Sequence, residues 1–217
     1  MPQDALTRAG LRTPKAAAVA GILFSILLLA IFWLLRSAVP ADPLEPGAWL
    51  AHSVGPAALA LNLIPFAGVA FLWFIGVLRD RLGQLEDRFF ATVFLGSGLL
   101  FLAMLFAAGA IVGALIIVAA SVRHDQLIDS PAFHLARAIS YLVVNVYAVK
   151  MAAVFMLSSS MVIIRTVIAP RWIAILGFVL GLIVLLGSYY LSWSVLVFPL
   201  WVLILSTHIL IANLGKR

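Results

Sequence analysis

The stretch YLVVNVYAVKMAAVFMLSSSMVIIR, residues Tyr141–Arg165, decides the fold of this chain. It is long and apolar, and Lys150 is the one charged residue that interrupts it before Arg165. A rise of about 1.5 Å per helical residue places Lys150 roughly 15 Å beyond Ser140, which is half the thickness of a hydrocarbon core. A charge at that depth is costly unless it is paired, hydrated or neutral. The stretch therefore predicts a membrane-spanning helix with a polar site near its centre.

The composition of the whole chain excludes a soluble globule. Of its 217 residues, 65% are hydrophobic and 10% are charged, and the mean hydropathy is +1.20. The apolar residues form about six runs close to the roughly 20 residues that span a bilayer as a helix, without the alternation of a β-barrel. The sequence predicts an all-α polytopic membrane protein, a six-transmembrane-helix bundle.

The predicted organisation is one transmembrane domain, 16–214, that follows a basic tail, 1–15. Its helices are expected at residues 16–35, 57–78, 90–121, 139–168, 172–190 and 195–214. The first run is too long for a cleaved signal and is expected to be a retained anchor. The fourth helix is expected to start outside the core, with Ser130 as its cap and Pro131 at its first position.

Lysines and arginines predict the orientation. With the amino terminus inside, ten of them fall on the inner side and three on the outer side. The inner set is Arg8, Arg12, Lys15, Arg79, Arg81, Arg88, Arg165, Arg171, Lys216 and Arg217, and the outer set is Arg36, Arg123 and Arg137. Both termini are therefore expected in the cytoplasm.

Several kinds of chemistry are not supported by the residues. Every aspartate and glutamate maps to a tail or a predicted loop, so carboxylate proton relays and cation sites within the membrane are not expected. The chain has no cysteine, and its histidines match no metal-ligand spacing. Its net charge of +6 lies at helix ends, which argues against nucleic acid as a partner. No catalytic residue, metal or cofactor is predicted.

Lys150 is the centre of the predicted polar site. On its own helix it shares a stripe with Tyr147, Ser158 and Arg165, and other helices offer Asn62 at a similar depth and His208 in the inner half. Three interpretations remain open. Lys150 is a neutral or weakly protonated packing residue, or it lines a cavity for an anion or an anionic lipid headgroup, or it contacts another subunit.

Two segments carry a resemblance to known proteins. They are Leu78-Arg-Asp-Arg-Leu-Gly83 after the second helix and Pro170-Arg-Trp-Ile-Ala-Ile-Leu-Gly177 at the start of the fifth. With the overall pattern, they resemble uncharacterised six-helix integral membrane families of GC-rich bacteria. The resemblance implies a fold and a location in the bacterial plasma membrane, and it implies no activity.

The function that the sequence favours is a small channel or transporter-like module for an anionic or lipidic species. The alternatives are an accessory subunit of a larger membrane complex and, third, an intramembrane enzyme. Two Gly-x3-Gly segments, at 109–113 and 177–181, predict close helix contacts within the chain or in a homo-oligomer. The lipid bilayer, an anionic ligand and a partner subunit are the partners considered.

Overall fold

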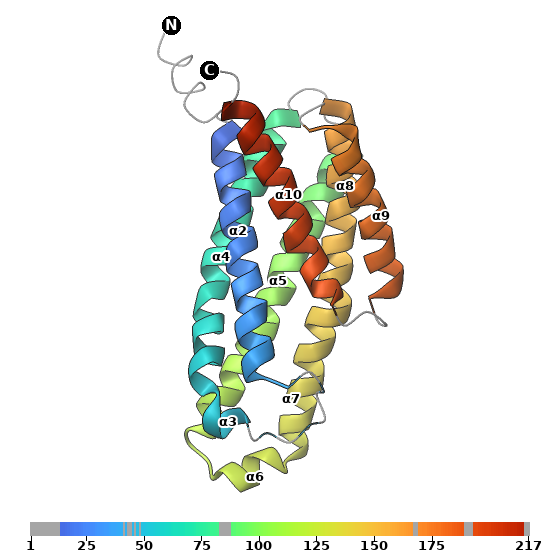
Figure 1. The fold of residues 1–217 in the computed structure, drawn as a ribbon. Helices are drawn as coiled ribbons and strands as arrows, with labels where there is room; N and C mark the ends of the chain where they lie inside the picture. The colour runs from blue at the N-terminus through green and yellow to red at the C-terminus, as the bar shows by residue number, and fades with distance from the viewer. Residues whose placement is uncertain are drawn as a thin grey trace, which may run out of the picture.

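A computed structural model describes residues 14–40, 42, 45, 47, 49–82, 88–166, 169–188 and 193–214, and the ordered elements among these are all helices (Figure 1). Their bounds, in chain order, are α2 Pro14–Ala38, α3 Trp49–His52, α4 Val54–Leu82, α5 Arg88–Ala119, α6 His124–Ile128, α7 Pro131–Leu142, η2 Val143–Ala148, α8 Val149–Thr166, α9 Arg171–Gly187 and α10 Ser194–Leu214.

Membrane-spanning helices are present, as the composition predicts. Within the described residues, five helical segments are long and apolar enough to cross a bilayer. They are Ala16–Ala38, Val54–Arg79, Thr92–Ala119, Pro131–Arg165 and Ser194–Ala212. The apolar helix α9 has 17 residues, or about 25 Å, and is shorter than these five. The prediction of an all-α membrane protein is confirmed at this level.

The bundle is built around a cluster of phenylalanine rings. Phe24 of α2 stacks on Phe71 of α4 with ring centroids 4.5 Å apart, and Phe198 of α10 lies 5.0 Å from Phe101 of α5. Phe155 of α8 closes the cluster, 5.1 Å from Phe71. In a bilayer the hydrophobic effect does not drive helices together, so this shape-dependent packing of rings stabilises the bundle.

The fourth span begins as the sequence predicts. The Ser130 side chain accepts a hydrogen bond from the Phe133 backbone N–H at 3.2 Å, and Pro131 occupies the first turn of α7. The helix then runs without a break through η2 and α8 to Thr166 (Figure 1). The middle segment η2 is a π-helix, a wider turn that the hydropathy pattern does not predict.

Several predicted boundaries differ from the structure. The segment between the first two predicted helices contains the short helix α3, and α4 begins at Val54 rather than at residue 57. The charged segment between the second and third predicted helices is helical through Leu82 and again from Arg88, while 83–87 lie outside the described residues. Charged residues at a helix end lower its hydropathy without breaking it, which explains why the sequence places this end too early.

Both Gly-x3-Gly segments pack inside the chain. A Cβ atom on Gly109 of α5 would lie 2.9 Å from Ile64 Cδ1 of α4. On α9, a Cβ atom on Gly177 would collide with Ser160 Oγ of α8 and lie 2.7 Å from Trp201 Nε1 of α10. The small residues therefore let α9 approach both α8 and α10 closely.

The hairpin formed by α9 and α10 is shorter than the rest of the bundle. The last turn of α9 and the first turn of α10 lie about midway along it, whereas α2, α4, α5 and α7 continue toward α3 and α6 (Figure 1). The half of the bundle that contains α3 and α6 therefore has fewer helices than the other half. The candidate site lies in this half.

Candidate functional site

A cavity of about 710 Å³ occupies the space below the α9–α10 hairpin. Its walls come from the last turns of α2, the middle of α5, the α7–η2 segment and the first turn of α10, with contributions from α4 and α3. This volume falls within the roughly 300–1,000 Å³ of small-molecule sites in proteins. The cavity is therefore large enough to hold a ligand rather than one or two waters.

The cavity lies at a seam between two parts of the bundle. Helix α2 packs on α4 and α10, whereas α7 packs on α5, and α2 and α7 have no extensive contact within the described residues. Trp33 of α2, which is 77% exposed, and Tyr141 of α7 line the cavity from opposite sides of this seam. The cavity is therefore bordered by side chains that face the surroundings of the bundle.

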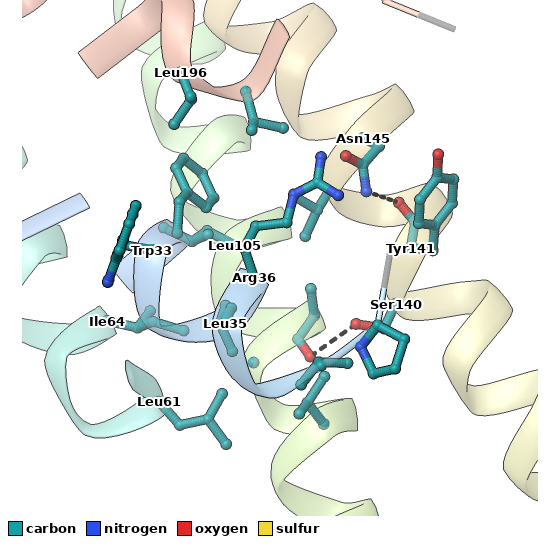
Figure 2. Close-up of a pocket in the computed structure, with 18 of the residues that line it drawn as sticks. Trp33, Leu35, Arg36, Leu61, Ile64, Leu105, Ser140, Tyr141, Asn145 and Leu196 are labelled. Carbon is teal, nitrogen blue, oxygen red and sulfur yellow. Dashed lines mark hydrogen bonds between the residues drawn. The ribbon is translucent and has the colours of Figure 1, made fainter. Parts of the chain in front are cut away.

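Most of the wall is hydrocarbon. Leu105 (Figure 2), Ala108 and Val112 of α5 line it, and the first two are buried. Leu196 of α10 lines the end near the hairpin, and Val144 of η2 lines the side. These positions offer an apolar ligand dispersion contacts along the length of the cavity.

Two arginines bring positive charge to the same cavity. Arg36 lies in the last turn of α2, and its guanidinium extends toward the α7–η2 side, near Asn145 (Figure 2). Arg137 of α7 is 6% exposed and donates from Nη2 to the backbone carbonyls of Pro40 at 3.0 Å and Asp42 at 2.9 Å. Because Pro40 follows the end of α2, these bonds place the Arg137 guanidinium beside the end of α2, whereas the guanidinium of Arg36 lies nearer Asn145 (Figure 2).

Two hydrogen-bond donors at this end have no partner among the described residues. They are the Nη1 atom of Arg137 and the indole Nε1 atom of Trp49, and both are buried. The two side chains lie together, with the Arg137 guanidinium carbon 6.0 Å from the Trp49 ring centroid, and both line the cavity. A buried donor without a partner costs about 1–3 kcal/mol, so native proteins leave few of them.

The polar groups on the α7–η2 side are bonded to backbone. Ser140 donates to the Ala108 carbonyl at 3.4 Å, which joins α7 to α5. Asn145 donates from Nδ2 to the Tyr141 carbonyl at 3.0 Å within its own helix (Figure 2). Asn145 lies in the π-helical segment η2, and its amide group forms part of the cavity wall.

The six side chains of the predicted polar site do not line this cavity. Lys150 is the second residue of α8 and is partly buried, and Tyr147 is 55% exposed. Asn62 donates to the Ala58 carbonyl of its own helix, and Ser158 donates to the Val154 and Phe155 carbonyls.

The other two members lie on different helices. Arg165 is exposed in the last turn of α8, and His208 is partly buried on α10. A ligand site that groups Lys150 with these residues stays a prediction.

The sequence does not single out the arginines of the cavity. Arg36 and Arg137 count among the topology signals, because each lies next to the end of a predicted span. One available signal was that Arg137 shares a helix face with His134 and Tyr141 near the start of an apolar span. The cavity itself is formed by segments far apart in the chain, and a single sequence does not show that they meet.

Comparison with protein families, with curated proteins and with solved structures finds no match to this chain. The functional argument therefore rests on the cavity and its residues.

Proposed function

We propose that the chain is a six-span protein of the bacterial plasma membrane with both termini in the cytoplasm. In this arrangement α9 is the sixth span, since 17 residues lie at the lower limit for crossing a bilayer. The start of α2 and the end of α10 lie at the same end of the bundle, which fits an even number of crossings (Figure 1). The excess of lysine and arginine assigns that end to the cytoplasm. The cavity then lies in the outer half of the membrane.

The function that this geometry supports best is the binding of an amphiphile, as part of a transporter-like module for an anionic or lipidic species. The observation that carries the proposal is a cavity of about 710 Å³ with hydrocarbon walls and two arginines. An apolar ligand would gain nothing from the arginines, and a small hydrophilic ion would leave the hydrocarbon walls uncovered. A molecule with an apolar tail and a polar head satisfies both parts of the surface.

A cavity-filling substitution tests the proposal. Val112→Phe places a ring in the cavity, whereas Val118→Phe changes the same helix at an exposed position outside it. We expect native mass spectrometry of the purified protein to detect a retained lipid on the wild type and on V118F, and at least about tenfold less on V112F, because a filled site excludes its ligand. Equal retention by V112F and V118F would show that the lipid is bound elsewhere.

A further inference from the structure

We infer that the cavity seats the phosphate headgroup of an anionic membrane lipid at Arg137 and Trp49, with the lipid tail along α5 toward α10. This inference rests on the proposed function, because it specifies the headgroup and the direction of the amphiphile proposed above.

The two buried donors without a partner among the described residues point to a hydrogen-bond acceptor as the ligand group for this end of the cavity. Arg137 uses Nη2 for the carbonyls of Pro40 and Asp42, and its Nη1 atom has no partner in the described part of the chain. Trp49 is 5% exposed, and its Nε1–H likewise meets no acceptor among those residues. Both nitrogens are covered, so a headgroup reaches them by displacing the side chains around them. Once there, one headgroup with several oxygen atoms accepts from both donors.

The guanidinium of Arg137 favours an acceptor with several oxygen atoms. A guanidinium presents its N–H groups in a planar fork that matches phosphate geometry. The carboxylates of Asp42 and Glu45 also act on Arg137 through space, and they offset part of its charge. Arg36 lines the same cavity with a second guanidinium, so the two arginines offset the two carboxylates, and the directed N–H groups rather than an excess of positive charge select the phosphate.

The hydrocarbon beyond this end favours a lipid over free phosphate. From Arg137 the wall continues along Leu105 of α5 to Leu196 of α10, and free phosphate would leave it empty. The seam between α2 and α7 is bordered by Trp33, whose indole is largely exposed on the bundle surface. In the proposed topology, α2 ends at the outer membrane surface, so Arg36 and Arg137 lie at the depth of the phosphates of outer-leaflet lipids.

The test compares three probes on the detergent-purified full chain by isothermal titration calorimetry: dioctanoyl phosphatidylglycerol, dioctanoylglycerol and inorganic phosphate. The first two have the same tails, and the second lacks the phosphate. We expect the phosphatidylglycerol to bind at least about tenfold more tightly than dioctanoylglycerol, the factor expected for charge-assisted hydrogen bonds. Inorganic phosphate at millimolar concentration is expected not to compete.

Two variants test whether Trp49 and Arg137 bind the phosphate, as distinct from the rest of the cavity, which binds the tails. Trp49→Phe removes the Nε1–H and keeps an aromatic ring, and Arg137→Gln removes the charge. We expect W49F to weaken phosphatidylglycerol binding about threefold to tenfold and R137Q to weaken it at least tenfold, with dioctanoylglycerol binding unchanged in both. Trp73→Phe is the control, because Trp73 is exposed on α4 and does not line the cavity. If R137Q does not fold, the affinity of W49F for phosphatidylglycerol is sufficient for the test.

The outcomes distinguish the seat from the proposed function. Equal affinity for the two lipids would show that Arg137 and Trp49 do not bind the lipid phosphate. The same conclusion would follow if neither W49F nor R137Q weakened phosphatidylglycerol binding. In both cases the proposed binding of an amphiphile would still stand. Competition by inorganic phosphate at an affinity equal to that of phosphatidylglycerol would overturn the assignment to a lipid. No binding of either lipid to the wild type would overturn the proposed function and the seat together.

Discussion

Lys150 is an ionisable residue in a span whose side chains include no carboxylate. The segment Pro131–Arg165 holds Arg137, Lys150 and Arg165, and no aspartate or glutamate. Lys150 is partly buried, and the structure places it outside the cavity wall. A lysine at the centre of a spanning helix costs about 2.5–3.5 kcal/mol on insertion scales, and snorkelling and water lower this cost.

Substitution of Lys150 tests whether its amino group has a stabilising partner. We expect Lys150→Met to keep or raise the stability of the fold, by up to about 2 kcal/mol, because it removes an ionisable group from an apolar span and keeps a long side chain. Unfolding by sodium dodecyl sulfate in mixed micelles measures the change. A loss of more than about 1 kcal/mol would show that the ammonium group has a stabilising partner in the chain or in a second subunit.

Residue-scale prediction from sequence succeeds where the interaction is local. The Ser130 cap and Pro131 are three residues or fewer from the backbone groups that they serve, and the structure confirms them. Arg137 behaves differently, because its partners Pro40 and Asp42 are 97 and 95 residues away in the chain. Without a second sequence, the residues themselves do not show that an arginine of the fourth span meets the end of the first.

At the scale of helices, hydropathy locates each apolar element and leaves its ends uncertain. The sixth predicted helix, 195–214, agrees with α10 to one residue, whereas α4 extends past both of its predicted ends. The π-helix η2 is invisible to a hydropathy pattern, since it changes the turn and not the composition. Its Asn145 lines the cavity, so this missed feature bears directly on the site.

Helix α9 provides a test of close packing. Gly177→Ala would drive the new methyl group into Ser160 Oγ and the Trp201 ring, whose Nε1 donates to the Ile173 carbonyl at 3.3 Å. We expect a loss of about 1–3 kcal/mol in the free energy of unfolding, the usual cost of overpacking a core.

The matched control for this substitution is Gly76→Ala on α4. A Cβ atom on Gly76 would meet no atom within 4 Å, so the variant is expected to be neutral or to gain up to about 1 kcal/mol in helix stability. Equal effects of the two substitutions, measured by the same unfolding experiment, would show that α9 does not approach α8 and α10 as closely as the structure has it.

At the scale of the whole molecule, topology is the prediction with the most direct test. The natural chain has no cysteine, so single cysteines report on sidedness without background. We expect a membrane-impermeant maleimide added to intact cells to label Ser121→Cys, after α5, and to label Gly215→Cys only after the cells are opened. Labelling of G215C in intact cells, with S121C protected, would reverse the orientation and move the cavity to the inner leaflet.

The sequence predicts the class of this molecule well, because composition alone decides between a bilayer and water as its solvent. It does not predict the cavity, which depends on where the α9–α10 hairpin ends relative to longer neighbours. Trp33, Arg36 and Arg137 line that cavity from elements that only the folded chain brings together. The sequence predicts the approximate length of each helix, but it does not predict how far each helix is shifted along the bundle axis relative to its neighbours.

The short helix α9 has a consequence for the membrane itself. Its roughly 25 Å leaves about 5 Å of an average 30 Å hydrocarbon layer unmatched on one flank, while α5 on another flank exceeds that thickness. In the proposed six-span arrangement, lipids beside α9 thin or bend to meet it, at a cost of a fraction of a kcal/mol for each ångström of mismatch. The hydrophobic perimeter of such a protein is uneven, and in a membrane of mixed thickness we expect its α9 flank to favour the thinner regions.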